Sequence, residues 1–212
     1  MKKPFDLNAD YQPASFTFAD QKQVQAILAR YPDDRARSGI MPLLDLAQRQ
    51  VATVGAKASP PFGGWIPRAA MDDIARICGV DPIKVYEVAT FYSMYNLAPV
   101  GKYLVQFCTT TPCWLCGSSK ILAAAESHLG IHMGQTTPDN MFTLIEVECL
   151  GACVNGPMIQ VNDDYYEDLT PENIVILLDD LQDGRRVSVG SQRGRKGSQA
   201  LSGPTTLLDR AG

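Results

Sequence analysis

The stretch FCTTTPCWLCG at residues 107–117 contains three cysteines, the first two of which have a C-x4-C spacing. After a gap of 35 residues, ECLGACVNG at residues 148–156 contains two more in a C-x3-C spacing. The four paired cysteines are Cys108 and Cys113 in the first pair and Cys149 and Cys153 in the second. Four thiols in two close pairs exceed what packing requires, so they indicate a metal or redox site.

The runs that lead into the two pairs predict strands. GKYLVQFC at residues 101–108 and FTLIEVEC at residues 142–149 are rich in strand-forming residues, and each ends in a cysteine. A helix over residues 118–129, capped by Ser118 or Ser119, is predicted between them. The later elements are two strands and a helix, at residues 157–163, 164–169 and 170–181.

This order of elements predicts an α/β fold that resembles the thioredoxin-like core, with a four-stranded mixed sheet. Sites in such folds lie beyond the carboxyl ends of strands, so we expect the two pairs to meet. Before this domain, apolar residues at helical spacing predict a helical bundle. The predicted divisions are an N-terminal arm at 1–18, a helical domain at 19–98, a thioredoxin-like domain with both cysteine pairs at 99–183 and a basic extended tail at 184–212.

The charge of the chain is unevenly distributed. Six Lys and Arg residues stand against one Asp from Gly184 onward, a balance of +5, which leaves −9 on residues 1–183 because the whole chain carries −4. The acidic body argues against nucleic acid as the main partner. The tail is rich in Gly, Ser and Arg without periodicity, so we expect it to be extended, with no packed element.

The N-terminal residues MKKPFDLNAD contain no apolar signal segment, and the chain has no run of membrane-spanning length. We therefore expect a cytosolic protein without direct membrane insertion. In that compartment, six cysteines indicate metal ligands or redox groups rather than a disulfide framework.

Three kinds of chemistry fit the thiols. A [2Fe-2S] cluster takes four thiolates, two on each iron, and two short-spaced pairs on neighbouring loops supply them. A structural zinc site also uses four cysteines, and the spacing does not exclude it. A domain of about 75 residues with four strands, however, should not need a metal to fold. Finally, Cys113 and Cys116 form a C-x-x-C before a helix, typical of thiol-disulfide oxidoreductases, which leaves three thiols unexplained.

The other candidate residues are interpreted structurally. Cys78 ends an apolar helical stripe and is expected to pack in a core, and Cys116 is expected to pack near the site. His128 and His132 have no visible catalytic partner. Three aromatic residues at helical spacing are expected in a core or interface: Phe91, Tyr92 and Tyr95. No nucleotide-binding glycine motif is present, so we expect no nucleotide on this chain.

Two long stretches carry a family resemblance: GGWIPRAAMDDIARICGVDPIKVYEVATFYSMYNLAPVGKYLVQFCTTTPC at residues 63–113 and ECLGACVNGPMIQVNDDYYEDLTPENI at residues 148–174. They closely resemble the 24 kDa (bacterial E) subunits of NADH:quinone oxidoreductase, respiratory complex I, which are thioredoxin-like [2Fe-2S] ferredoxins. The resemblance extends from about Phe16 to Leu181.

The resemblance implies one [2Fe-2S] cluster held by Cys108, Cys113, Cys149 and Cys153. It also implies an electron-transfer role within a translocase, without an active site on this chain. FMN and NADH would bind to a partner flavoprotein subunit, and a large iron-sulfur subunit of the peripheral arm would be the second partner. The location implied is the cytoplasmic side of the bacterial inner membrane, or the mitochondrial matrix side for a mature eukaryotic protein.

Two residues depart from the family pattern, since Cys116 is not a family ligand and Gly156 stands where alanine is common. Related modules serve NAD-linked hydrogenases and formate dehydrogenases, and these are the alternative parent complexes. The basic tail resembles a C-terminal extension that lies along partner subunits. We therefore expect that deletion from Gly184 leaves the cluster unchanged and weakens docking to the flavoprotein.

Overall fold

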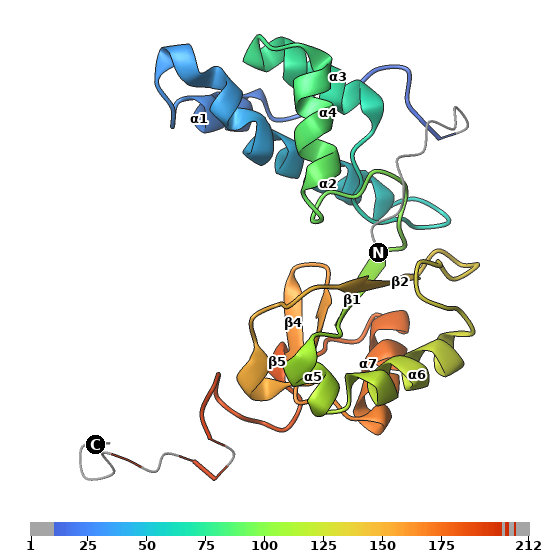
Figure 1. Ribbon diagram of the computed structural model, residues 1–212. Coiled ribbons are helices and arrows are strands. Elements are labelled where there is room, and N and C mark those ends of the chain that lie inside the picture. The colour runs from blue at the N-terminus through green and yellow to red at the C-terminus, as the bar shows by residue number, and fades with distance from the viewer. Residues whose placement is uncertain (1–10, 201, 204–205, 207–212) are drawn as a thin grey trace. The chain divides into compact units, whose positions relative to one another are not determined.

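The computed structural model describes residues 11–200, 202, 203 and 206 (Figure 1). These residues divide into two compact units. Of the described residues, those at 11–103 and 138–142 belong to the helical unit, and those at 104–137 and from 143 onward belong to the cysteine unit. Among the described residues, no helix has the length and apolar character needed to cross a membrane.

The helical unit contains four α-helices and one 3-10 helix: α1 (Gln21–Leu28), η1 (Asp33–Gly39), α2 (Ile40–Gly55), α3 (Arg68–Cys78) and α4 (Pro82–Phe91). The ends of these helices are set by residues that lie next to them in the sequence. Asp20 accepts a hydrogen bond from the Gln23 N–H at 3.0 Å and so caps α1. Gly79 ends α3 in the left-handed region at φ 64°, which glycine adopts without steric cost. The last helix ends at Phe91, earlier than the sequence pattern suggests.

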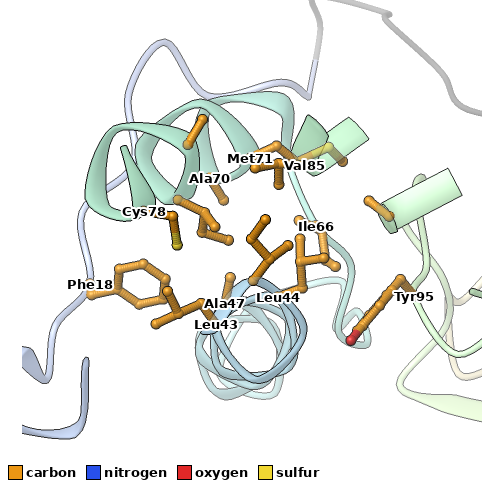
Figure 2. Close-up of a cluster of buried hydrophobic side chains, with 14 of the residues drawn as sticks. Phe18, Leu43, Leu44, Ala47, Ile66, Ala70, Met71, Cys78, Val85 and Tyr95 are labelled. Carbon is orange, nitrogen blue, oxygen red and sulfur yellow. The ribbon is translucent and has the colours of Figure 1, made fainter. Parts of the chain in front are cut away.

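The core of the helical unit is formed where α2 packs against α3 and α4 (Figure 2). Leu43, Leu44 and Ala47 from one face of α2 are completely buried. They meet buried side chains of the neighbouring segments, including Ile66, Ala70, Met71, Ile74 and Val85. Tyr95 closes the end of this core, where its hydroxyl donates to the Met41 carbonyl at 2.9 Å, while Phe91 is exposed. Tyr95 therefore lies in the core, whereas the place of the exposed Phe91 in an interface stays a prediction.

The cysteine unit has the α/β fold predicted from the sequence, with strands and helices alternating along the chain. Its elements are β1 (Tyr103–Cys108), α5 (Thr111–Leu115), α6 (Ser118–Leu129), β2 (Phe142–Val147), η2 (Cys153–Asn155), β3 (Ile159–Val161), β4 (Asp164–Glu167), α7 (Pro171–Gln182) and β5 (Gly190–Ser191). The strands form one mixed sheet in the order β2-β1-β3-β4-β5. The sheet thus has five strands instead of the four expected.

The direction of β1 and β2 brings the ends of both strands to one edge. The Tyr103 N–H donates to the Met141 carbonyl at 2.7 Å near the start of the strands, and Thr109 Oγ1 donates to Glu146 Oε1 at 2.6 Å near their ends. The two strands therefore run the same way, as expected when a helix connects them. On the other side of β1, β3 pairs antiparallel, with Phe107 opposite Ile159.

Helices α6 and α7 lie side by side in the cysteine unit (Figure 1). Buried apolar residues face inward from both, among them Ile121, Ala125, Leu177 and Leu178. A contact of 2.7 Å between His128 Nε2 and Asp179 Oδ1 joins the two helices. His128 thus has the structural role that the sequence suggested.

Two local expectations in this unit are wrong. Ser118 lies inside α6, and the capping position belongs to Gly117, whose φ of 98° no serine adopts easily. The short helix α5 was not anticipated, although Pro112 in its first turn suits a helix start. Because α5 occupies residues 111–115, the Cys113 thiol emerges from a helix and not from an extended chain.

The beginning of the tail is packed, which corrects the expectation of an extended tail with no packed element. Gly190 and Ser191 pair in parallel with Tyr166 and Glu167 of β4. Asp168, only 3% exposed, accepts hydrogen bonds from Ser191 Oγ at 2.6 Å and from Arg195 Nε at 2.9 Å. A buried carboxylate needs such partners, and no periodicity in the sequence reveals a pairing of this kind. We call residues 190–197 the strap.

Replacement of Leu44 by alanine should lower the free energy of unfolding of the helical unit by about 2–5 kcal/mol, because the side chain is fully buried. The matched control is Val54→Ala on the same helix, where the side chain is 62% exposed and the expected change is within about 0.5 kcal/mol. Urea unfolding followed by circular dichroism measures both. Equal effects of the two substitutions would contradict the assignment of Leu44 to the core.

Candidate metal centre

The first cysteine pair is buried. Cys108 is the last residue of β1 and Cys113 lies in α5, and each is 1% exposed. The two pack together with Met158, which is fully buried. Thr110 Oγ1 lies 3.3 Å from Cys108 Sγ and donates a hydrogen bond to it when the thiol is ionised. This pair is therefore held in a dry environment with a hydroxyl group directed at one sulfur.

The second pair lies after β2, with the exposed Cys149 in the loop and the half-buried Cys153 as the first residue of η2. Cys149 Sγ and Cys153 Sγ are 3.7 Å apart. Two ligands on one tetrahedral metal lie about 3.8 Å apart when the metal–sulfur bond is about 2.3 Å, so this separation suits a shared metal. Gly151 makes the turn between them at φ 85°, and Tyr165 Oη donates to the Leu150 carbonyl at 2.8 Å. The loop is thus fastened to β4 between its two thiols.

The two pairs lie close enough for groups of one pair to contact or influence groups of the other. Leu150 and Ala152, which lie between Cys149 and Cys153, pack against the buried cluster of Cys108, Cys113 and Met158. The charge of Cys108 also acts on Cys153, and that of Cys153 acts on Cys113. Within the described part of the chain, no three His, Cys, Asp or Glu side chains converge to hold a single metal ion. The thiols are arranged as two pairs, and two irons with two thiolates each require that arrangement.

The acidities of the thiols differ within the first pair. Burial raises the pKa of Cys108, but hydrogen bonds from Thr110, the Leu150 N–H and Cys113 outweigh it and leave that pKa below its ordinary value. Burial, followed by the hydrogen bond and charge of Cys108, raises the pKa of Cys113 to about 12. The shared hydrogen bond with Cys149, then burial, raises the pKa of Cys153. Without metal, therefore, Cys108 is the thiol of this pair that ionises more readily, and Cys113 stays protonated beside it.

The remaining cysteines, Cys116 and Cys78, are not members of the two pairs. Cys116 follows α5 and is exposed, whereas the attacking thiol of a C-x-x-C motif should be the accessible first cysteine with a lowered pKa. Here the first cysteine is Cys113, which is buried and has a raised pKa. Cys78 is buried in the helical unit, where burial raises its pKa to about 11, in agreement with a packing role.

Sequence reasoning missed two groups that shape the site. One is Thr110, whose hydroxyl reaches Cys108; the hydroxyl-rich run between the first two cysteines was a signal for it. The other is Asn155, which is 3% exposed and lies two residues after Cys153. Its position before a glycine is typical of a turn. That sequence pattern does not reveal the contacts that the Asn155 side chain makes in the fold.

An α/β unit of this kind, with thiol pairs beyond the ends of two adjacent strands, defines a thioredoxin-like iron-sulfur protein. Residues 24–182 match the family described as thioredoxin-like [2Fe-2S] ferredoxin, and the chain belongs to this family. Membership supports a [2Fe-2S] cluster as the bound group.

Among its relatives, the chain is 49% identical over 202 residues to "NADH dehydrogenase [ubiquinone] flavoprotein 2, mitochondrial" of Dictyostelium discoideum, a match that covers 95% of this chain and 77% of the relative. It is 50% identical over 171 residues to the E subunit of the NADH-quinone oxidoreductase of Rickettsia conorii, covering 79% of this chain and 95% of the relative. A crystal structure of an NAD+-reducing [NiFe]-hydrogenase shares the fold, with a TM-score of 0.53 and 19% identity, over 67% of this chain and 23% of that chain.

Two glycines of the second loop should respond differently to alanine. Gly151→Ala should lower the free energy of unfolding of the cysteine unit by about 1–2 kcal/mol, because φ of 85° is strained for an L-residue although the space beside it is open. Gly156→Ala is the control, since Gly156 has φ −68° and an added Cβ would lie 3.4 Å from Cys113 Sγ, an ordinary contact. Chemical unfolding of the protein without metal measures both, and equal stability would contradict the proposed role of Gly151 in the turn.

Proposed function

We propose that this chain is an electron-transfer subunit of an NADH:quinone oxidoreductase, corresponding to the bacterial E-type subunits of complex I, and that it carries one [2Fe-2S] cluster. The ligands proposed are Cys108, Cys113, Cys149 and Cys153. The observation that carries the proposal is the packing of Leu150, from the loop of the second thiol pair, against Cys108 and Cys113 of the first, within a chain about half identical to subunits so named.

When bound, the cluster supplies reversible one-electron exchange. The protein residues control how easily negative charge is accepted at the sulfurs. Thr110 and the Leu150 N–H direct donors at Cys108, and a backbone N–H from Met158 does so at Cys113. Such hydrogen bonds, together with burial, are the main protein determinants of a cluster's reduction potential. The buried pair therefore offers a more strongly controlled setting than the exposed pair.

A flavoprotein subunit that binds FMN and NADH is the proposed electron partner, and the large iron-sulfur subunit of the peripheral arm is the second. The sequence has no nucleotide-binding glycine motif of its own. Three exposed apolar residues lie one or two positions after a proposed ligand: Trp114, Leu115 and Val154. Exposed apolar groups of this kind suit a protein interface. We propose a location in the peripheral arm, on the cytoplasmic face of the bacterial inner membrane or the mitochondrial matrix side.

A corresponding subunit of an NAD-linked hydrogenase or formate dehydrogenase is the second candidate. The shared fold with the NAD+-reducing hydrogenase favours it, but at 19% identity this likeness concerns the fold alone. Relatives at about 50% identity carry complex I subunit names. Purification from the native source and identification of the associated flavoprotein distinguish the parent complexes.

The purified chain should contain about two irons and two labile sulfides, and it should give an EPR signal on reduction. Cys149→Ser should abolish most of this content, because it removes a proposed ligand. Cys116→Ser is the matched control and should retain it, since Cys116 is exposed and outside the pairs. One zinc without iron in a sample never exposed to chelator would refute the cluster. Insulin reduction by the wild type, lost in Cys116→Ser, would favour a thiol-disulfide oxidoreductase.

Docking to the flavoprotein should depend on the apolar residues beside the thiols. Leu115→Glu places a charge on a side chain that is 71% exposed, and we expect at least about a tenfold loss of affinity, the effect of losing one interface hot spot. Ile176→Glu on α7 is the matched control, because that side chain is 60% exposed and lies on a different element. Iron content should be unchanged in both, and binding is measured by calorimetry. Unaltered affinity of Leu115→Glu would contradict the proposed face.

A further inference from the structure

The turn that follows Cys153 is held by groups distant in the sequence. The Asn155 carbonyl accepts a hydrogen bond from the Asp168 N–H at 2.7 Å, just beyond β4. Asn155 Nδ2 donates to Glu167 Oε2 at 2.6 Å and to the Gly197 carbonyl of the strap at 2.7 Å. Arg195 Nη2 reaches the Val154 carbonyl at 3.5 Å. Both residues that follow Cys153 are therefore bonded to the strap.

Asp168 fixes the strap in place. Its backbone is in the left-handed region at φ 55°, and its carboxylate is 3% exposed. That carboxylate forms an ion pair with the Arg195 guanidinium, whose side chain is 14% exposed, and it accepts from Ser191 Oγ. Burial of an ion pair contributes little net stability, but removal of one partner leaves the other charge uncompensated. The pair therefore determines one geometry for the strap more than it adds stability.

A simpler role for the strap is to cover an open sheet edge. Residues 190–191 do so by pairing with β4. That role needs only the paired residues, whereas the contacts of Arg195 and Gly197 extend past the sheet to Val154 and Asn155. The strap thus bridges the sheet edge and the turn that bears Cys153.

From these contacts we infer that the strap holds the Cys153 turn in the arrangement that binds the cluster, and that Arg195 is a positioning residue for this purpose. The inference rests on the proposed ligation by Cys149 and Cys153. It reverses the expectation that deletion from Gly184 leaves the cluster unchanged. Groups that orient metal ligands from outside the ligand set commonly determine how firmly the metal is held.

The test uses the full-length chain with its cluster and compares Arg195→Ala, Arg195→Lys and Lys196→Ala. Lys196 is the matched control because it is exposed, adjacent in the strap and of equal charge. The measurements are the rate of iron loss to an excess of chelator, the EPR spectrum of the reduced protein and the midpoint potential. Thermal unfolding of each protein without metal separates loss of stability from loss of positioning.

Arg195→Ala should lose iron about 10-fold faster than wild type, with an altered EPR spectrum, since outer groups of metal ligands commonly contribute at least this much. Arg195→Lys should lie between the two, because an ammonium group keeps the charge without the planar fork. Lys196→Ala should match the wild type.

Wild-type rates and spectra in Arg195→Ala, or equal acceleration in Lys196→Ala, would overturn the inference while the cluster itself stands. If Arg195→Ala yields no folded protein, a wild-type rate in Arg195→Lys overturns it. A wild-type protein without iron would instead overturn the proposed function, and the inference with it.

Discussion

The packing of Leu150 and Ala152 against Cys108, Cys113 and Met158 joins two thiol pairs that are far apart in the sequence. Bringing four thiolates together costs desolvation and mutual repulsion, so donors must be directed at the sulfurs. The surrounding structure brings the thiols together and directs such donors at them. Parallel β1 and β2 end at one edge of the sheet, and Tyr165 fastens the loop that carries Leu150. Without this fastening, the second pair would belong to a free loop.

The two halves of the site are built differently. Cys108 and Cys113 are buried among apolar side chains and come from a strand end and a short helix. Cys149 is exposed, and its loop depends on side-chain contacts with β4 and the strap. Low local dielectric strengthens the hydrogen bonds at the first pair, while water competes for those at the second. The second pair is therefore the half of the site that is open to solvent.

Fold alone does not determine which thiol chemistry a thioredoxin-like domain performs. The acidities of the thiols separate the alternatives here. A dithiol oxidoreductase needs an accessible first cysteine with a lowered pKa, but burial and the charge of Cys108 raise the pKa of Cys113. The same burial suits a metal ligand, because a metal displaces the thiol proton and spreads the charge. Family membership agrees with this conclusion from an independent direction.

Elements whose formation depends on neighbouring residues could be predicted from the sequence alone. The Asp20 cap and the Gly79 stop depend on neighbouring residues only, and the spacing of the cysteines indicated two pairs of ligands. Features that depend on partners distant in the sequence could be seen only in the folded structure. The fifth strand, the buried Asp168–Arg195 pair and the contacts of Asn155 join segments 12 to 42 residues apart. Such contacts leave no periodic trace, because each is stabilised by a single buried polar group that finds its partner only after the chain has folded.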